Sequence, residues 1–176
     1  MDLYRCRICG DTYLGAEAPT HCPFCGAHRV LIVASREFPI DINDVDLTEM
    51  EREDLEASVE TERSNTRFYL AVAAQGGNGH LRSYFKRLAK VEAEHCSVFC
   101  KLLGTPKPDD LMTPSESTGS WASDIEDSLR REDRAVALYR SFAQRATTPR
   151  VQEVFEAIMM VELDHIALDE AAEGYL

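Results

Sequence analysis

The stretch Val91-Glu92-Ala93-Glu94-His95 returns seventy residues later as Val161-Glu162-Leu163-Asp164-His165. Both copies read V-E-x-[E/D]-H, which places a carboxylate and an imidazole three residues apart. Residues three apart on a helix share one face. Each copy therefore presents a Glu–His pair to one side of a helix, and the chain carries this helical pattern twice.

The same offset of seventy relates Glu62 to Glu132 and Tyr69 to Tyr139. In each copy thirty residues separate the first glutamate from the glutamate of the V-E motif. The chain therefore contains two copies of one helical hairpin, each with Glu on its first helix and Glu-x-x-His on its second. The candidate metal ligands and catalytic residues are Glu62, Glu92, His95, Glu132, Glu162 and His165. Four carboxylates and two imidazoles on facing helices form the ligand set of ferritin-like di-iron or di-manganese proteins.

Capping signals and apolar stripes delimit four long helices. Thr48-x-x-Glu51 and Ser123-x-x-Glu126 are capping-box patterns, and Thr148-Pro149 places proline at a first helical position. The helices are expected to begin near residues 48, 80, 123 and 149. Apolar residues recur along each at alternating steps of three and four, the spacing of a bundle seam. Residues 104–122 are rich in proline and lack periodicity, as expected of a crossover along a ferritin-like bundle.

The six candidate ligands interrupt otherwise apolar stripes near the middle of each helix. Burying four carboxylates together is costly unless protons or cations neutralise them. Two divalent ions carry a charge of +4, which matches the four carboxylates. Carboxylate and imidazole without thiolate favour iron or manganese, and the sequence leaves that choice open. Glu62 and Glu132 would each bind one metal, Glu92 and Glu162 would bridge the two, and His95 and His165 would each cap one.

Three other residues with ionisable side chains lie on the stripes. Tyr69 and Tyr139 lie two turns from Glu62 and Glu132, where a phenol either hydrogen-bonds a ligating carboxylate or simply packs its ring. Asp169, nearer one helix end, either orients a histidine or reaches solvent, and solvent is the favoured expectation.

The first forty or so residues form a different unit. Cys6-Arg7-Ile8-Cys9-Gly10 and Cys22-Pro23-Phe24-Cys25-Gly26 are two C-x-x-C-G knuckles, whose four thiolates can hold iron or zinc tetrahedrally. So short a segment lacks a sufficient core, and a bound metal would stabilise it. We expect a metal-binding domain over residues 1–37, a linker over 38–46 that contains Pro39, and the helical bundle over 47–176.

Composition narrows the function classes. A net charge of -12 argues against nucleic acid or an anionic membrane as partner. No apolar run reaches the length of a membrane-spanning helix, and the first residues do not resemble a signal peptide. We therefore expect a cytoplasmic protein, and in a reducing compartment paired C-x-x-C motifs are more readily metal ligands than disulfides.

The N-terminal motif resembles the rubredoxin-like domain of the rubrerythrin family. The resemblance rests on Tyr4–Gly10, Gly15, Ala18-Pro19, Cys22–Cys25, His28 and Phe38, and the paired Glu-x-x-His motifs extend it to the ferritin-like domain. The rubredoxin-like part comes first here, as in the reverse rubrerythrins. The resemblance implies a peroxidase of oxidative-stress defence, which reduces hydrogen peroxide to water at a di-iron centre. Electrons would come from a reductase or rubredoxin through an Fe(Cys)4 centre, and the protein would be a homodimer.

The chain departs from the family pattern at one place. Rubrerythrins usually carry a further glutamate one turn after the third-helix ligand, where this chain has Ala135 and Val136. The departure leaves the six ligands in place but puts in doubt the ligand exchange associated with peroxidase chemistry. Two alternatives therefore stay open: a dioxygen-reducing or ferroxidase protein with the same metals, and a non-enzymatic metal-binding bundle with a structural zinc ribbon.

Overall fold

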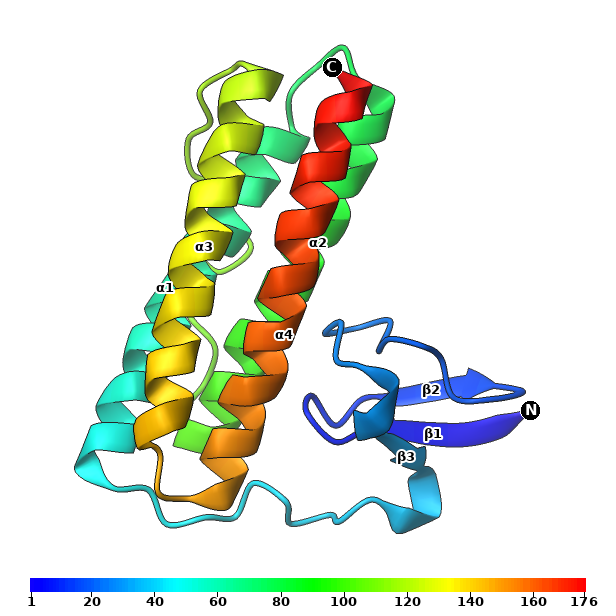
Figure 1. The fold of residues 1–176 in the computed structure, drawn as a ribbon, viewed down its shortest axis with the longest axis vertical. Helices are drawn as coiled ribbons and strands as arrows, with labels where there is room; N and C mark the ends of the chain where they lie inside the picture. Colours follow the sequence, from blue (N-terminus) through cyan, green and yellow to red (C-terminus); the bar gives the residue numbers. More distant parts are fainter.

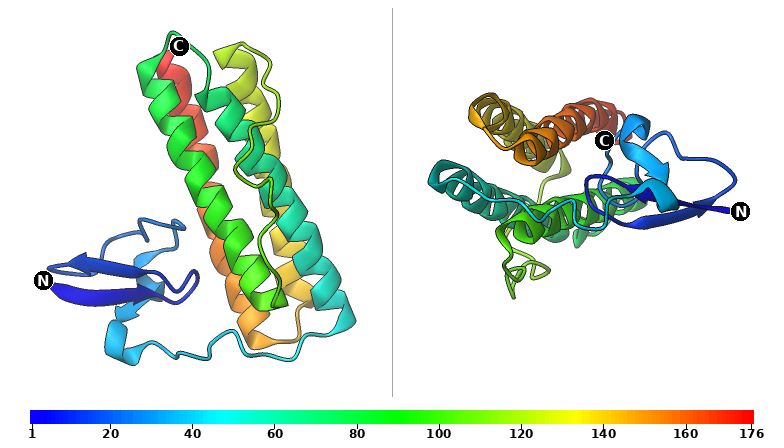
Figure 2. Two further views of the ribbon diagram at one scale, coloured as in Figure 1. Left: turned by 180° about the vertical axis from the view of Figure 1, so that it is seen from behind. Right: turned by 90° about the horizontal axis from the view of Figure 1, so that it is seen from below.

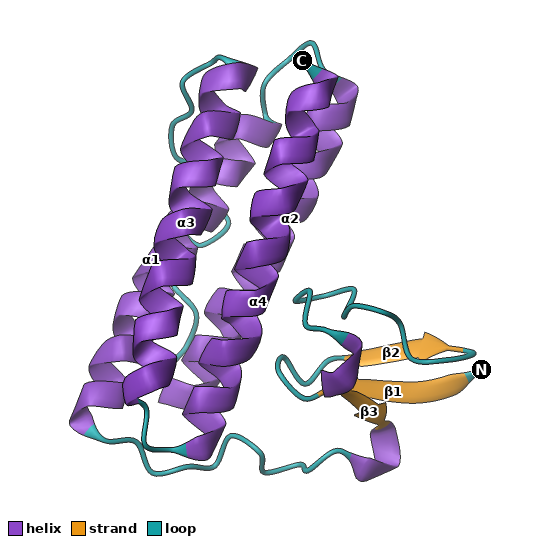
Figure 3. Cartoon of the chain, viewed as in Figure 1, coloured by secondary structure: helices purple, strands orange, loops and turns teal.

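The computed structural model describes residues 1–176 as four long helices and a small three-stranded sheet (Figures 1 and 3). The helices are α1 (Glu49–Ala73), α2 (Gly79–Leu103), α3 (Trp121–Arg145) and α4 (Pro149–Ala172), and the strands are β1 (Asp2–Cys6), β2 (Thr12–Gly15) and β3 (Ile32–Ala34). The expected fold class, a mainly helical four-helix bundle preceded by a small rubredoxin-like unit, is confirmed.

The bundle consists of two antiparallel hairpins, α1–α2 and α3–α4. The connection from α2 to α3 runs back along the length of the bundle, so that α2 and α3 point the same way (Figure 2). Asp110 fastens this connection to α1, because Arg63 and Arg67 donate hydrogen bonds of 2.6–2.7 Å to its carboxylate. The predicted crossover is therefore present, and it is held to the bundle by charge pairs.

The helix ends agree with the capping predictions in part. Thr48 and Glu51 form the predicted capping box at α1, with Glu51 N donating to Thr48 Oγ1 at 3.2 Å and Thr48 N to Glu51 Oε2 at 2.9 Å. The prediction for the third helix was wrong. Ser120, not Ser123, is its N-cap, because the hydroxyl of Ser120 accepts the Ser123 amide and lets the helix begin at Trp121.

The start of α4 differs from the prediction in a second way. Pro149 occupies the first turn as expected, but Thr148 makes no side-chain cap to its own helix. Its hydroxyl bonds Glu51 at 2.9 Å instead, and the amides of Thr147 and Thr148 donate to Glu51 Oε1 at 2.9 and 2.7 Å. Burial opposes ionisation of Glu51, but these bonds and those from Thr48 lower its pKa to about 2. The buried Glu51 thus ties the start of α1 to the start of α4.

The sheet has the order β2-β1-β3 and lies beside the α2–α4 face of the bundle (Figures 1 and 2). Cys6, Cys9, Cys22 and Cys25 are buried in the same apolar cluster as residues of all four helices. Polar bonds cross the contact, since Lys101 Nζ donates to Cys9 O at 2.7 Å and Arg150 Nη2 to Arg7 O at 2.8 Å. Residues 38–46, the expected linker, contain no helix or strand. None of the helices combines the length and apolar character needed to span a membrane.

Candidate metal centres

The structure brings all six predicted ligands of the bundle together at one depth. Glu62 comes from α1, Glu92 and His95 from α2, Glu132 from α3, and Glu162 and His165 from α4. All are fully buried except His165, which is 4% exposed. The i, i+3 spacing puts each Glu–His pair on the inner face of its helix, and four such helices enclose the cluster.

The cluster divides into two sets of four that share two members. One set is Glu62, Glu92, His95 and Glu162, and the other is Glu92, Glu132, Glu162 and His165. His95 Nδ1 lies 3.2 Å from Glu92 Oε2 and 3.0 Å from Glu162 Oε1. His165 Nδ1 lies 2.9 Å from Glu92 Oε1 and 2.8 Å from Glu162 Oε2. The two shared glutamates are those expected to bridge a pair of metals.

Buried atoms without hydrogen-bond partners test whether metals fit here. The cluster holds six of them: Glu62 Oε2, Glu92 Oε1, Glu132 Oε2, both carboxylate oxygens of Glu162, and His165 Nδ1. Buried polar atoms are nearly always hydrogen-bonded, and each one left unsatisfied is costly. Metal–ligand bonds would satisfy oxygens and nitrogens placed in this way. The donor set therefore fits two cations better than it fits a protein core.

The electrostatics of the cluster point the same way. Burial and the charges of Glu92 and Glu162 raise the pKa of both Glu62 and Glu132 well above the usual range of a glutamate. Burial also disfavours the charged form of the other members. The histidines nonetheless lower the pKa of Glu92 and Glu162, and these two glutamates raise the pKa of His95 to about 10. In the metal-free protein, protons on glutamates and histidines thus balance the charge of the four carboxylates. In the loaded protein, two divalent cations would take over this role.

Each buried tyrosine donates its hydroxyl to a candidate ligand on the opposite hairpin. Tyr69 of α1 donates to Glu132 Oε1 on α3, and Tyr139 of α3 donates to Glu62 Oε1 on α1. The sequence left open whether these tyrosines bond to carboxylates or only pack their rings, and in the structure both hydroxyls bond to carboxylates. Burial, together with the neighbouring glutamates, raises the pKa of both phenols, so they remain hydrogen-bond donors.

A chain of polar groups continues beyond Tyr69. Ser128 Oγ lies 3.3 Å from the Tyr69 hydroxyl and 2.5 Å from Asp169 Oδ2, and Tyr84 donates to Asp169 Oδ1 at 2.6 Å. The expectation that Asp169 reaches solvent is wrong, since the residue is fully buried. Tyr84 and Ser128 supply the hydrogen bonds that make this burial possible. Burial raises the pKa of Asp169 to about 6, although both hydrogen bonds lower it in part.

The four predicted cysteine ligands converge in the N-terminal unit. The Sγ atoms of Cys6 and Cys25 are 3.7 Å apart, as are those of Cys9 and Cys22. Backbone amides point at the sulfurs, with Ile8 N 3.4 Å from Cys6 Sγ and Asp11 N 3.4 Å from Cys9 Sγ. Gly10 and Gly26 have φ of 84° and 77°, the left-handed turn that each knuckle needs. Hydrogen bonds among the four thiols lower the pKa of Cys22 and raise the pKa of Cys9 and Cys25, so the metal-free site keeps protons that a bound metal would displace.

The two centres touch through one histidine. His95 turns Nδ1 toward the carboxylates, and its Nε2 lies 2.9 Å from the carbonyl oxygen of Cys25. A histidine that binds metal through one nitrogen usually donates a hydrogen bond from the other. The acceptor here is the backbone of a cysteine in the second knuckle. Periodicity could not reveal this contact, because Cys25 and His95 are seventy residues apart in the sequence.

A second contact between the units involves Asp164. His28 Nε2 lies 2.7 Å and His21 Nε2 3.7 Å from Asp164 Oδ2. Asp164 directly precedes the candidate ligand His165, so this half-exposed contact holds the N-terminal unit beside the cluster. The only signal for it in the chain is the presence of two histidines near the second knuckle.

Comparisons with known proteins agree with this geometry. Residues 4–30 match the family model "Rubrerythrin, rubredoxin-like domain", and residues 53–122 match the model "Rubrerythrin". Reverse rubrerythrin-1 of Clostridium acetobutylicum is 34% identical over an alignment of 123 residues, and the alignment covers 64% of this chain and 68% of the relative. This chain belongs to the rubrerythrin family. No solved structure matches it.

The family match confirms the reversed order of the two domains and the type of both centres. The four-cysteine site and the carboxylate–histidine cluster are consistent with an Fe(Cys)4 centre and a di-iron centre. The "Rubrerythrin" match ends at residue 122, so the ligands of α3 and α4 rest on the repeat and on the geometry. Ala135 and Val136 are buried, and neither offers a further ligand.

Proposed function

We propose that the protein is a di-iron peroxidase that reduces hydrogen peroxide to water with electrons relayed through its four-cysteine centre. The observation that carries this proposal is the hydrogen bond from His95 Nε2 to the Cys25 carbonyl, which joins a candidate ligand of one centre to the backbone of the other. A structural zinc ribbon has no need of such a contact, whereas for an electron donor it provides a short path to the bundle cluster.

Each centre has a defined set of residues to hold it. Cys6, Cys9, Cys22 and Cys25 would bind one iron, and the six bundle residues would bind two, with Glu92 and Glu162 shared. When bound, the iron pair supplies the two electrons that cleave the O–O bond of peroxide. The protein keeps the site dry, because five of the six bundle ligands are fully buried.

Peroxide reduction also consumes two protons, and the chain of Asp169, Ser128 and Tyr69 is suited to supply them. When Asp169 is protonated it can donate to Ser128 Oγ, which donates to Tyr69, which in turn donates to Glu132 Oε1. A carboxyl with a pKa of about 6 is partly protonated near neutral pH and can both give up and regain its proton there. Tyr84 keeps the other Asp169 oxygen in place.

The contact between the units makes an electron route available within one chain. Electrons from a reductase or rubredoxin would enter at the four-cysteine centre and leave through the second knuckle toward His95. A homodimer, which the family resemblance implies, would offer a second route between subunits.

The test is a titration of the reduced, iron-loaded protein. Its visible spectrum should show ferric tetrathiolate bands that bleach on reduction and return in proportion to the hydrogen peroxide added. Dioxygen serves as the comparison oxidant. Faster reoxidation by dioxygen than by peroxide, or zinc at the four cysteines of active protein, would contradict the proposal.

His95→Gln sharpens the test, because it removes the imidazole that meets Cys25. His165→Gln is the control, since it also removes a ligand imidazole but not the contact with Cys25. Return of the ferric tetrathiolate bands should slow at least about tenfold more in His95→Gln than in His165→Gln.

A further inference from the structure

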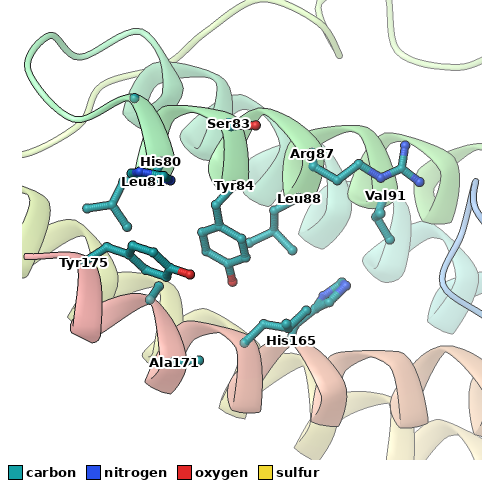
Figure 4. A pocket seen from close by; sticks show the side chains of 13 residues that line it. His80, Leu81, Ser83, Tyr84, Arg87, Leu88, Val91, His165, Ala171 and Tyr175 are labelled. Atoms are coloured by element: carbon teal, nitrogen blue, oxygen red, sulfur yellow. The ribbon is translucent and has the colours of Figure 1, made fainter.

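A cavity of about 580 Å³ lies between the first turns of α2 and the last turns of α4 (Figure 4). It extends from His80 and Tyr175, whose rings stack at 5.3 Å, to His165 of the candidate metal cluster. Helices rise about 1.5 Å per residue, so the stretch from His165 to Ala172 covers about 10 Å. Hydrogen peroxide needs roughly twice the ~30 Å³ share of a water molecule, and the cavity is far larger.

The lining of the cavity is mainly apolar along its length and carries polar side chains at both ends. Its sides are formed mainly by aliphatic residues: Leu81, Leu88, Val91, Leu168, Ala171 and Ala172. Tyr84 of α2 and His165 of α4 both point into the space between the two helices, and the stacked rings of His80 and Tyr175 lie at the other end of the cavity (Figure 4). The guanidinium of Arg87 is already engaged, since it donates to the carbonyl of Pro23.

The part of the cavity near Tyr84 and His165 adjoins the candidate metal cluster. His165 is the one candidate ligand with any exposure, and its Nδ1 faces Glu92 and Glu162 at 2.9 and 2.8 Å. The hydroxyl of Tyr84 reaches Asp169, the first member of the chain that leads to Glu132. A hydroperoxide group placed between Tyr84 and His165 would therefore lie beside both the metal cluster and the proton supply.

We propose that the protein also reduces alkyl hydroperoxides, with the alkyl chain lying along the aliphatic walls of this cavity and the hydroperoxide group near Tyr84 and His165. This inference rests on the peroxidase function proposed above. The reaction is ROOH + 2 H⁺ + 2 e⁻ → ROH + H₂O. The O–O bond breaks, the distal oxygen leaves as water and the alkyl oxygen becomes the alcohol. The electrons come from the same external donor through the four-cysteine centre.

The test compares octyl hydroperoxide with hydrogen peroxide as oxidants of the reduced, iron-loaded protein. Leu168→Trp fills the cavity from α4, and Leu163→Trp is the matched control, since Leu163 is also half-exposed on α4 but does not line the cavity. The ratio of the octyl hydroperoxide rate to the hydrogen peroxide rate should fall at least tenfold in Leu168→Trp and stay unchanged in Leu163→Trp. Ala171→Phe, on the same wall, is a second filling variant and should behave as Leu168→Trp does.

A binding measurement gives a second readout that needs no turnover. Calorimetric titration of the oxidised protein with 1-octanol should show one binding site that Leu168→Trp weakens at least tenfold and Leu163→Trp does not. A protein that reduces hydrogen peroxide but not octyl hydroperoxide contradicts this inference alone. A protein that reduces neither contradicts the peroxidase function and this inference with it. Equal rate ratios in the two tryptophan variants would also overturn it.

Discussion

The two halves of the metal cluster have equivalent ligands but different neighbours. On one side, Glu62 accepts a hydrogen bond from Tyr139, whose ring packs against Phe99 at 5.5 Å and Phe155 at 6.0 Å. On the other side, Glu132 accepts from Tyr69, which leads on through Ser128 to Asp169. The difference arises at one pair of repeat positions, where Phe99 in the first copy corresponds to Asp169 in the second.

The serines that correspond in the repeat show the effect of this exchange. Ser128 bonds across the bundle to Asp169 at 2.5 Å, whereas Ser58 turns back to the carbonyl of Asp54 in its own helix at 2.7 Å. With Phe99 opposite, Ser58 has no acceptor across the bundle. The repeat thus supplies two equivalent sets of candidate ligands, and its divergence makes the surroundings of one set apolar and gives the other a chain of hydrogen-bonding groups.

The largest expected effect is on metal affinity, and it comes from removing the ligand histidine of either half by a single substitution. His95→Ala and His165→Ala each delete one metal ligand, and each should lower affinity for the second metal at least about 100-fold, more than the loss of an outer partner does. Metal analysis after dialysis should find about one bundle metal per chain in both. Retention of two metals in either variant would show that the halves are not equivalent as ligand sets.

The pKa of Asp169 predicts a pH dependence that the Phe99 side lacks. A pKa raised from 3.8 to about 6 in the folded protein means that folding favours the protonated form. This contribution is fully present below pH 3.8 and is lost as the pH rises through 6, a change of roughly 3 kcal/mol. In the metal-free protein, the unfolding free energy of the wild type minus that of Asp169→Asn should fall over this range. A pH-independent difference would contradict the burial assigned to Asp169.

Asp169→Asn should slow peroxide turnover by about 10- to 100-fold, because an amide cannot pass on a proton. It keeps the size of the side chain and an oxygen for Tyr84. The solvent deuterium isotope effect should rise at the same time. Phe99→Leu is the matched variant on the other side and should leave the isotope effect unchanged. An equal rise in both variants would contradict the proposal that protons travel on the Asp169 side alone.

Substitutions of the two tyrosines distinguish the support of a metal ligand from proton transfer. Tyr69→Phe and Tyr139→Phe each delete a hydrogen bond to a candidate ligand, and each should weaken metal binding by about tenfold. Tyr69→Phe alone should also raise the solvent isotope effect, because Tyr139 has no polar partner beyond Glu62. Stopped-flow mixing of the reduced variants with peroxide in light and heavy water measures both.

The smallest effect distinguishes the serines. Ser128→Ala leaves a buried Asp169 oxygen without its partner and should cost about 1–2 kcal/mol of unfolding free energy. Ser58→Ala removes a bond within one helix and should cost less than about 0.5 kcal/mol. Urea unfolding of both variants provides the comparison, and equal costs would mean that the Ser128–Asp169 bond contributes little.

The repeat made most of the centre predictable. Helical periodicity converts spacings of three and thirty residues into shared faces and shared depth, so all six bundle ligands follow from their positions in the chain. The C-x-x-C-G knuckles likewise made the four candidate cysteine ligands predictable, because the geometry of each knuckle is local. Asp169 was misjudged because periodicity gives the face of a residue but not its partners, and Tyr84 and Ser128 lie on other helices.

Spacing along the chain was enough to predict the four helices, the four-cysteine unit and the sets of candidate ligands that the fold brings together. How these parts meet depended on packing in three dimensions. The folded chain places the carbonyl of Cys25 on His95, Asp164 beside two histidines of the N-terminal unit, and an apolar cavity against His165. Each of these features joins side chains from elements far apart in the chain, and such contacts depend on how surfaces pack, for which a single sequence carries no periodic signal.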